Sequence, residues 1–234
     1  MAPEAVVLLQ ARMASTRLPG KALAPIGGVP VLTHCLQRLV ASGVGRVLLA
    51  TTTAPEDDAL VEEAARVGVA AVRGSSFDVL GRFAQAVRQT RATFVVRATG
   101  DNPAVDIDAA GRTLDALFRS VADYCCERGL PAGGAVEAMR TRVLLDAAAR
   151  ATTDADREHV TTYIRRERGR YRVVEPDAPQ AVRRPDLRLT VDTAADLAFM
   201  RAVADGLPGA ALSRAPLAAI IAAADRVAAQ ERVA

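Results

Sequence analysis

The chain has 234 residues, of which 50% are hydrophobic and 24% are charged, a composition typical of a globular protein rather than a disordered one. The formal net charge of +3 comes from residues of both signs scattered along the chain, and only 3% of the residues are aromatic. Because no dense basic block with interleaved aromatic residues is present, we expect no nucleic-acid partner. The nearest candidate, residues 165–168, is explained better as a solvated helix face.

The cysteines and histidines do not have the spacing of a zinc site. Cys35, Cys125 and Cys126 form no C-x-x-C pattern, and the chain has only two histidines. The adjacent pair at 125 and 126 lies in an apolar stretch and is expected to be buried in a strand. No apolar segment is long enough to span a membrane, and the first residues do not resemble a secretory signal. We therefore expect a cytoplasmic protein without a membrane partner.

Strands and helices alternate through the first hundred residues. Continuous apolar runs predict strands at residues 6–9, 47–50, 69–72 and 94–96. Helical patterns lie between them: from Pro30 to near Gly43, from residues 55–58 onward, and over residues 77–89 with Asp78 as the N-cap. This alternation predicts an α/β fold of three layers, α/β/α, around a mostly parallel mixed sheet. In such sheets ligands bind at the carboxyl ends of the strands.

The second half is less regular, but we interpret it as part of one domain, residues 1–234. Helices are expected at residues 106–118, 141–150, 156–168, 194–205 and 216–232. Extended segments are expected at residues 123–126, 135–139, 171–174 and 187–191. Residues 176–185 are interpreted as an excursion rather than a linker, and no internal repeat is visible.

Lys21 is the only lysine of the chain, since 29 of the 30 lysine and arginine residues are arginine. It ends a loop that follows the first predicted strand and contains Arg12, Ser15, Arg17 and Gly20. A lysine ammonium is a compact point charge suited to phosphate oxygens, and glycine lets backbone amides approach an anion closely. The alternative is codon drift, which could leave one surface lysine anywhere. The loop matches neither G-x-G-x-x-G nor G-x-x-x-x-G-K-[ST], so it predicts a phosphate or nucleotide site of another kind.

Two carboxylates follow buried extended runs. Asp101 comes directly after the fourth predicted strand, and Asp192 directly follows residues 187–191. Hard carboxylate oxygens beside phosphates indicate Mg²⁺, which takes only one or two protein ligands and keeps several waters. For Asp101 an ordinary turn or cap is an equal alternative. In isolation, Asp192 would be interpreted as the N-cap of the helix that starts near Ala194.

Residues 10–21, QARMASTRLPGK, closely resemble the opening motif of the cytidylyltransferases that activate acidic sugars. These are the CMP-Kdo and CMP-sialic acid synthetases, together with the SpsF-like spore-coat polysaccharide group. The resemblance continues in the same order through residues 50–52, 55–58, 73–82, 99–103, 156–161 and 184–193. It covers nearly the whole chain, and it implies the Rossmann-like fold of the nucleotide-diphospho-sugar transferases.

The resemblance also implies roles for individual residues. Arg12, Arg17 and Lys21 would hold the triphosphate of CTP, and Asp101 and Asp192 would hold Mg²⁺. Further nucleotide contacts would come from Gln10, Ala11, Ser15, Ser76, Asp78, Val79, Arg82 and Thr99. The acceptor would be contacted by Glu137, Arg157 and His159, although a helix-cap role for the histidine is equally open. The implied reaction is attack by a sugar hydroxyl or phosphate oxygen on the α-phosphate, with release of pyrophosphate.

The chain departs from the family pattern at two acidic positions, which here are Ala135 and Ala195. If the missing carboxylates contact metal or acceptor, the protein takes a different acceptor or binds metal more weakly. Two other functions therefore stay open. One is a nucleotide-sugar glycosyltransferase with Asp106 and Asp108 as its metal-binding D-x-D, and the other is a catalytically degenerate partner protein. The resemblance further implies a homodimer, formed through an excursion near residues 125–140.

Overall fold

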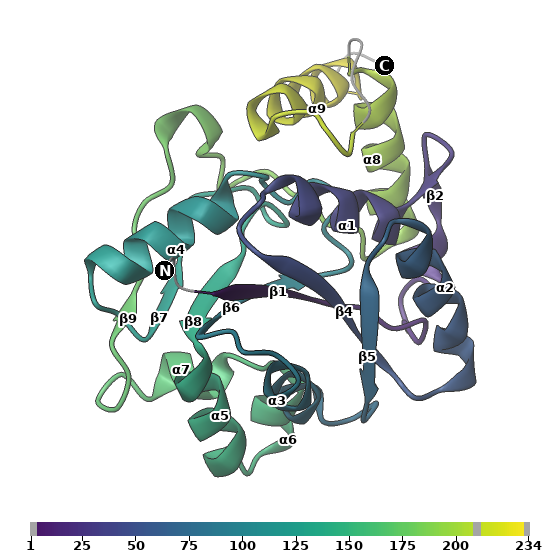
Figure 1. The fold of residues 1–234 in the computed structure, drawn as a ribbon. Coiled ribbons are helices and arrows are strands. Elements are labelled where there is room, and N and C mark those ends of the chain that lie inside the picture. Colours follow the sequence, from purple (N-terminus) through teal and green to yellow (C-terminus); the bar gives the residue numbers. More distant parts are fainter. Residues whose placement is uncertain (1–3, 208–211, 232–234) are drawn as a thin grey trace.

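The computed structural model describes residues 4–207 and 212–231, and it has three layers, with a central sheet between two layers of helices (Figure 1). In the described residues the sheet has seven strands: β1 (Ala5–Gln10), β4 (Arg46–Thr52), β5 (Ala70–Gly74), β6 (Phe94–Thr99), β7 (Tyr124–Cys126), β8 (Glu137–Arg140) and β9 (Val173–Val174). Their order is β5-β4-β1-β6-β8-β7-β9, and only β8 runs antiparallel to its neighbours. The predicted mostly parallel mixed sheet is confirmed. A short hairpin pairs β2 (Pro25–Ile26) with β3 (Val29–Pro30).

Helices cover both faces of the sheet (Figure 1). One face carries α1 (Val31–Ala41), α2 (Asp58–Arg66), α4 (Ala109–Arg119), α8 (Ala194–Asp205) and α9 (Leu217–Glu231). The other carries α3 (Val79–Arg88), α5 (Thr141–Arg150), α6 (Asp154–Glu158) and α7 (Thr162–Arg166). Short 3-10 helices lie at η1 (Lys21–Leu23), η2 (Pro55–Asp57) and η3 (Gln180–Val182). Among the described residues, none of the helices is both long and apolar enough to cross a membrane.

Strand β1 lies inside the sheet, and its continuous apolar sequence follows from burial on both faces. Val7 and Leu9 pack in the core beneath α1, whereas Val6 and Leu8 pack in the core beneath α3. Burial of each such side chain stabilises the fold by about 1.5–3 kcal/mol. The register pairs Gln10 with the carboxyl end of β6, so the chain leaves β1 and β6 at the same edge of the sheet.

Helix caps fix the segments that reach this edge. Asp78 caps α3, as predicted, by accepting a hydrogen bond of 2.7 Å from the Gly81 amide. The N-cap of α8 is Thr193, which forms a capping box with Asp196. The interpretation of Asp192 as an N-cap is therefore wrong, and its carboxylate is available for other contacts.

The predicted continuous helix over residues 156–168 is also wrong, because the chain breaks between α6 and α7. Val160 has a positive φ of 54°, which a β-branched residue rarely adopts. Its side chain is fully buried, and the neighbouring Thr161 hydroxyl donates to Glu137 at 2.7 Å. These tertiary contacts outweigh the helical pattern of the local sequence. Cys125 is buried in β7 as predicted, but Cys126 is only partly buried.

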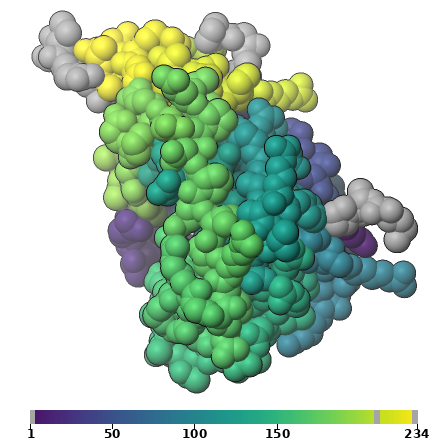
Figure 2. All heavy atoms as spheres, turned by 90° about the vertical axis from the view of Figure 1, so that its left-hand side faces the viewer, coloured from purple at the N-terminus to yellow at the C-terminus, as the bar shows by residue number. Residues whose placement is uncertain are grey.

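The loop between β7 and β8 is hydrogen-bonded to the segment that follows β9. The Arg128 amide donates to the Pro176 carbonyl at 2.8 Å, and the Arg184 amide donates to the Gly129 carbonyl at 2.8 Å. Seen from the β9 edge, this green segment runs along the surface past the teal α4 towards the yellow α9 (Figure 2). The homodimer through residues 125–140 stays a prediction. The predicted helix over residues 216–232 is confirmed as α9, with Arg232 outside the described residues.

Candidate active site

The loop that follows β1, residues 11–20, is fastened to the sheet by Asp57. Its carboxylate accepts hydrogen bonds from the Met13 amide at 2.7 Å, the Thr51 hydroxyl at 2.9 Å and the Thr52 amide at 3.0 Å. Burial alone would raise the pKa of Asp57, but these donors hold it below its ordinary value. Asp57 is thus ionised and anchors the middle of this loop.

Gly100 brings the chain that leaves β6 against the end of β1. Its amide donates to the Gln10 carbonyl at 2.8 Å, and a Cβ at this position would lie only 2.8 Å from the Cβ of Ala11. Glycine is therefore required for this close approach. As a result, Thr99 and Asp101 lie beside the residues that follow β1.

A cavity of about 660 Å³ opens at this edge of the sheet. It lies at the carboxyl ends of β1 and β6, where parallel sheets bind their ligands. Most of the predicted site residues line it: Gln10, Ala11, Arg12, Ser15, Arg17, Lys21, Val79, Arg82, Thr99, Asp101, His159 and Asp192. The structure therefore brings together residues that are up to 182 positions apart in the sequence, between Gln10 and Asp192.

Lys21 lies at one end of the cavity between two carboxylates. Its Nζ is 3.0 Å from Asp101 Oδ2 and 2.8 Å from Asp192 Oδ1, and it also donates to the Val191 carbonyl at 2.9 Å. Gly20, whose φ is +71°, precedes it and turns the chain into η1. The predicted phosphate ligand and the two predicted metal ligands thus form one contact group.

Asp192 meets two further cations. Arg17 Nη2 lies 2.9 Å from its Oδ1, and Arg188 Nη2 lies 2.5 Å from its Oδ2. Arg188 also contacts Asp196 at 3.2 Å. Partial burial would raise the pKa of Asp192, but Lys21 and the two arginines hold it below its ordinary value.

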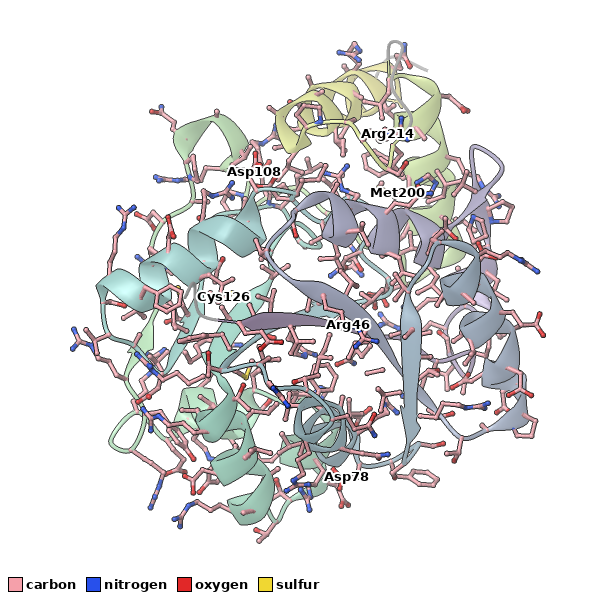
Figure 3. The ribbon with its side chains drawn as sticks, in the orientation of Figure 1. Arg46, Asp78, Asp108, Cys126, Met200 and Arg214 are labelled. Carbon is pink, nitrogen blue, oxygen red and sulfur yellow. The ribbon has the colours of Figure 1, made fainter. Side chains whose placement is uncertain are left out.

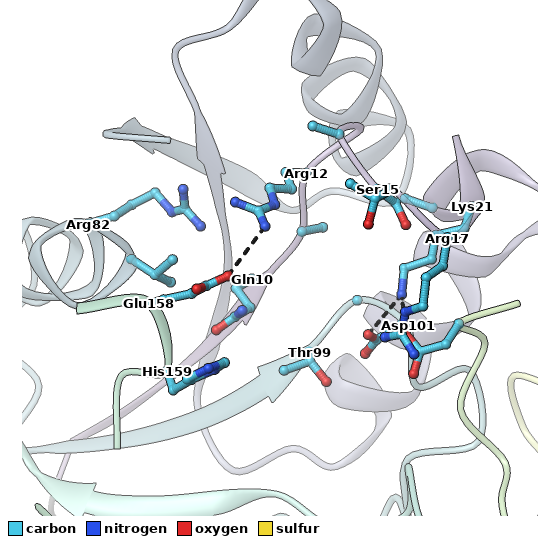
Figure 4. Close-up of a pocket in the computed structure, with 17 residues that line it drawn as sticks. Gln10, Arg12, Ser15, Arg17, Lys21, Arg82, Thr99, Asp101, Glu158 and His159 are labelled. Atoms are coloured by element: carbon cyan, nitrogen blue, oxygen red, sulfur yellow. Dashed lines mark hydrogen bonds and ion pairs between the residues drawn. The ribbon is translucent and has the colours of Figure 1, made fainter. Parts of the chain in front are cut away.

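The other end of the cavity is formed by Arg12, Arg82 and Glu158, while Gln10 and Thr99 are drawn between the two ends (Figure 4). Arg12 Nη2 lies 3.7 Å from Glu158 Oε1. Arg82 is only 2% exposed, and within the described residues its Nε has no hydrogen-bond partner. Burial and the charge of Arg12 lower the pKa of Arg82 to about 10.

Four predicted residues do not line the cavity. The carbonyl of Ser76 accepts a hydrogen bond from Arg12 at 3.3 Å, and Asp78 caps α3. Arg157 donates to the Ala148 carbonyl at 2.8 Å and approaches Asp78 at 3.6 Å. Ser76 thus contacts a residue of the cavity lining, and Asp78 and Arg157 lie at the start of α3, which carries two more.

Glu137, the fourth, lies in a separate cluster that we call the β8 cluster: Glu137, Arg97, Tyr124 and Thr161. Arg97 and the Tyr124 hydroxyl donate to the Glu137 carboxylate, as does Thr161. Burial alone would raise the pKa of Glu137, but Arg97 and the two hydroxyl groups hold it below its ordinary value. Arg97 also donates to Gln10 Oε1 at 3.1 and 3.2 Å, so the β8 cluster orients one residue of the cavity.

The D-x-D candidate lies away from the cavity. Asp106 forms an ion pair with Arg112 at 2.6 Å, and Arg112 also binds Glu127 at 2.7 Å. Asp108 is the N-cap of α4, on the opposite face of the sheet from Asp78 (Figure 3). Neither aspartate lines the cavity.

Ala135 and Ala195 do not line the cavity either. Ala135 is partly buried against the core, whereas Ala195 is exposed in the first turn of α8. Neither alanine therefore supplies a group to the cavity lining.

Sequence reasoning missed Asp57, Arg97 and Arg188 as residues that support the site. Asp57 and Arg188 lie inside stretches that match the family, residues 55–58 and 184–193, and this match was the available signal. Arg97 lies in the apolar strand β6 without such a signal.

Comparison with known proteins places the chain in one family. The family profile described as cytidylyltransferase matches residues 6–215. The spore coat polysaccharide biosynthesis protein SpsF of Bacillus subtilis is 35% identical over 202 residues, which are 84% of each chain. A solved cytidylyltransferase from Leptospira borgpetersenii has a TM-score of 0.88 at 25% identity and covers 97% of this chain and 96% of its own.

A more distant solved structure shows the shared fold. It is a CMP:2-keto-3-deoxy-manno-octonic acid synthetase complexed with CTP, with a TM-score of 0.63 at 19% identity over 86% of this chain and 98% of its own. The family match, the SpsF-like relative and the cavity at the sheet edge agree with one another. The chain belongs to the cytidylyltransferase family and is a nucleotidyltransferase.

Proposed function

We propose that this enzyme transfers CMP from CTP to an acidic sugar or a related small-molecule acceptor and releases pyrophosphate. The observation that carries the proposal is the convergence of Lys21 with Asp101 and Asp192 at one end of a cavity whose other end contains arginines. The family membership supports cytidine as the base. Positioning and charge neutralisation supply most of the rate of such a transfer.

The triphosphate would lie along the loop after β1. Arg12, Ser15, Arg17 and Lys21 all line the cavity and carry the donors that phosphate oxygens require. The nucleoside would extend towards Val79 and Arg82. Negative charge that develops on the leaving pyrophosphate would be neutralised by Lys21 and Arg17.

Asp101 and Asp192 fit a divalent cation, for which we propose Mg²⁺. Both carboxylates can contact a single cation, since an oxygen of each lies within 3.0 Å of Lys21 Nζ. No group of three or more His, Cys, Asp or Glu side chains suited to a metal occurs within the described residues. Mg²⁺ needs only one or two carboxylates because phosphates and water complete its shell. When bound, it would stabilise charge on the phosphates.

The acceptor would lie near Gln10, Thr99 and His159, which all line the cavity. Arg97 donates hydrogen bonds to the side-chain oxygen of Gln10, Oε1. The side-chain NH₂ of Gln10 therefore points away from Arg97. A hydrogen-bond donor at this place suits the oxygen-rich surface of an acidic sugar. Glu137 and Arg157 would act on the acceptor through their neighbours rather than by contact.

Incubation with CTP, Mg²⁺ and a panel of acidic sugars and phosphonates tests the proposal. We expect a CMP-conjugate and one pyrophosphate for each CTP consumed, both lost in Lys21→Ala and in Asp101→Ala. A matched control is Arg119→Ala, which removes an exposed ion pair with Asp115 and does not change the cavity lining. In a parallel incubation with a nucleotide sugar, transfer of its sugar would instead support the glycosyltransferase. CTP binding without turnover on any acceptor would support the degenerate partner.

A cytoplasmic location and a homodimer belong to the same proposal. The dimer would form near residues 125–140, where the loop between β7 and β8 reaches the surface beside the segment after β9. The mass of the purified protein in solution, measured by light scattering, tests this part separately. A monomer at all concentrations would reject the dimer without affecting the proposed reaction.

A further inference from the structure

The two carboxylates proposed to hold metal are already neutralised by side chains of this chain. Lys21 bridges Asp101 and Asp192, and Arg17 and Arg188 complete the contacts of Asp192. With Asp196, which Arg188 also contacts, three cationic side chains face three carboxylates. The cluster is therefore balanced in charge before any metal arrives.

The ammonium of Lys21 lies where a metal bridging the two carboxylates would lie. Its Nζ is at hydrogen-bond distance from one oxygen of each, and a divalent cation would use the same oxygens. An ammonium and a metal ion cannot share this position, because like charges so close repel strongly. Metal binding to both aspartates therefore requires that Lys21 leave.

We propose that Asp101 and Asp192 accept a divalent cation only after a triphosphate has drawn Lys21, with Arg17, away from them. This inference rests on the proposed function. A triphosphate supplies new acceptor oxygens for both cations and also supplies ligands to the metal. The nucleotide thus removes the internal cation and completes the metal site in one exchange.

The side chains are suited to this exchange. Lysine has a flexible four-carbon stem, so its ammonium can move while the backbone of η1 stays in place. Arg17 is exposed, with 63% of its side chain accessible, and its contact to Asp192 is the outermost of the cluster. Arg188 does not line the cavity, and it can keep its contact with Asp192 Oδ2, since Lys21 and Arg17 contact the other oxygen, Oδ1.

Binding of Mn²⁺ without nucleotide, followed by electron paramagnetic resonance, tests the inference. We expect weak binding to the wild type and at least tenfold tighter binding to Lys21→Met, which removes the ammonium but keeps an apolar stem. The double variant Lys21→Met/Asp192→Asn should lose this gain. Arg119→Met, which removes an exposed cation from its ion pair with Asp115, should bind Mn²⁺ as the wild type does.

Equal Mn²⁺ affinity in the wild type and in Lys21→Met would overturn the inference. Should Lys21→Met not fold, Arg17→Met serves instead, because it removes one exposed cation from Asp192 and should give a smaller gain. An unchanged affinity in that variant would also contradict the exchange. If the CTP-dependent reaction fails while these gains in Mn²⁺ affinity appear, the proposed function is wrong but the internal cation is real.

The unique lysine allows a second measurement on the unaltered chain. Protein labelled with ¹⁵N-lysine carries a single side-chain ammonium, that of Lys21. We expect inorganic tripolyphosphate to shift its nuclear magnetic resonance signal, and Mg²⁺ alone to leave it unchanged. A shift of the same size with Mg²⁺ alone would show that metal displaces Lys21 without phosphate and would reject the proposal.

Discussion

Lys21, in contact with Asp101 and Asp192, and Glu137, in the β8 cluster, are almost equally hidden from solvent, yet their surroundings differ. The exposed fraction is 15% for the Lys21 side chain and 13% for the Glu137 side chain. Lys21 lines a cavity, and one of its two carboxylate partners, Asp192, also pairs with the exposed Arg17, which we propose a triphosphate draws away. Glu137 instead receives hydrogen bonds from a buried tyrosine and a buried threonine. Burial alone does not distinguish a group that binds a ligand from a structural group. A group that binds a ligand lies beside a cavity and has partners that the ligand can replace.

The largest effect on stability is expected from Glu137→Ala. It leaves Arg97 in a partly buried place without its carboxylate, and breaking such a pair costs about 3–5 kcal/mol. For a chain of this size the midpoint of thermal unfolding should fall by about 10 °C. The activity of the folded variant at low temperature should stay within about tenfold of the wild type, since Glu137 does not line the cavity. An unchanged melting midpoint with a much higher acceptor KM would instead make Glu137 an acceptor ligand.

Lys21→Ala should lower activity strongly and stability little, the opposite of what we expect for Glu137→Ala. Removal of one donor that acts on developing charge lowers kcat by about a hundredfold or more, equivalent to about 2.7 kcal/mol. The thermal midpoint should change far less than in Glu137→Ala. Lys21→Arg should restore little activity, because a planar guanidinium does not replace a point-like ammonium. Full activity of Lys21→Arg would contradict the assignment.

Asp57→Asn tests a residue that combines both properties, being buried like Glu137 but in contact with the loop of the cavity. Loss of the charge weakens its bonds to the Met13 amide and to two threonines, and we expect a loss of about 2 kcal/mol in the free energy of unfolding. The KM for CTP should rise as the loop loosens. Chemical denaturation and steady-state kinetics measure the two effects. A lower stability with an unaltered KM would show that the loop does not depend on this anchor.

The smallest effect is the response of stability to acid. Glu137 has a folded pKa below its ordinary value of 4.5, so below pH 4.5 the unfolded chain binds the proton more readily. The stability from this group is therefore complete above that pH and is lost as the pH falls through the lower, folded value. Urea denaturation at several pH values should show a shallower decline for Glu137→Gln than for the wild type. Identical slopes would mean that Glu137 does not contribute.

Much of the fold is predictable because it follows from local pattern. Apolar runs identify the parallel strands, and Asp78 signals the start of α3. The break at Val160 is not predictable in this way, because a buried valine at positive φ is imposed by the core rather than by its neighbours in sequence. The motif after β1 indicates the ligand, but the role of Arg97 depends on the register that brings it to Gln10. Glu137 could be found from the family resemblance, and Thr161 lies in a matching stretch, whereas Arg97 and Tyr124 lie outside the matching stretches.

Thermal unfolding with each nucleoside triphosphate and Mg²⁺ tests whether the cavity binds CTP through Lys21, and this measurement needs no acceptor. At about a hundred times the dissociation constant, CTP should stabilise the protein by about 2.7 kcal/mol and raise the midpoint by about 5–10 °C. We expect CTP to give the largest rise in the midpoint and Lys21→Ala to abolish this rise. Selective stabilisation by a purine triphosphate, or an equal rise in Lys21→Ala, would contradict it.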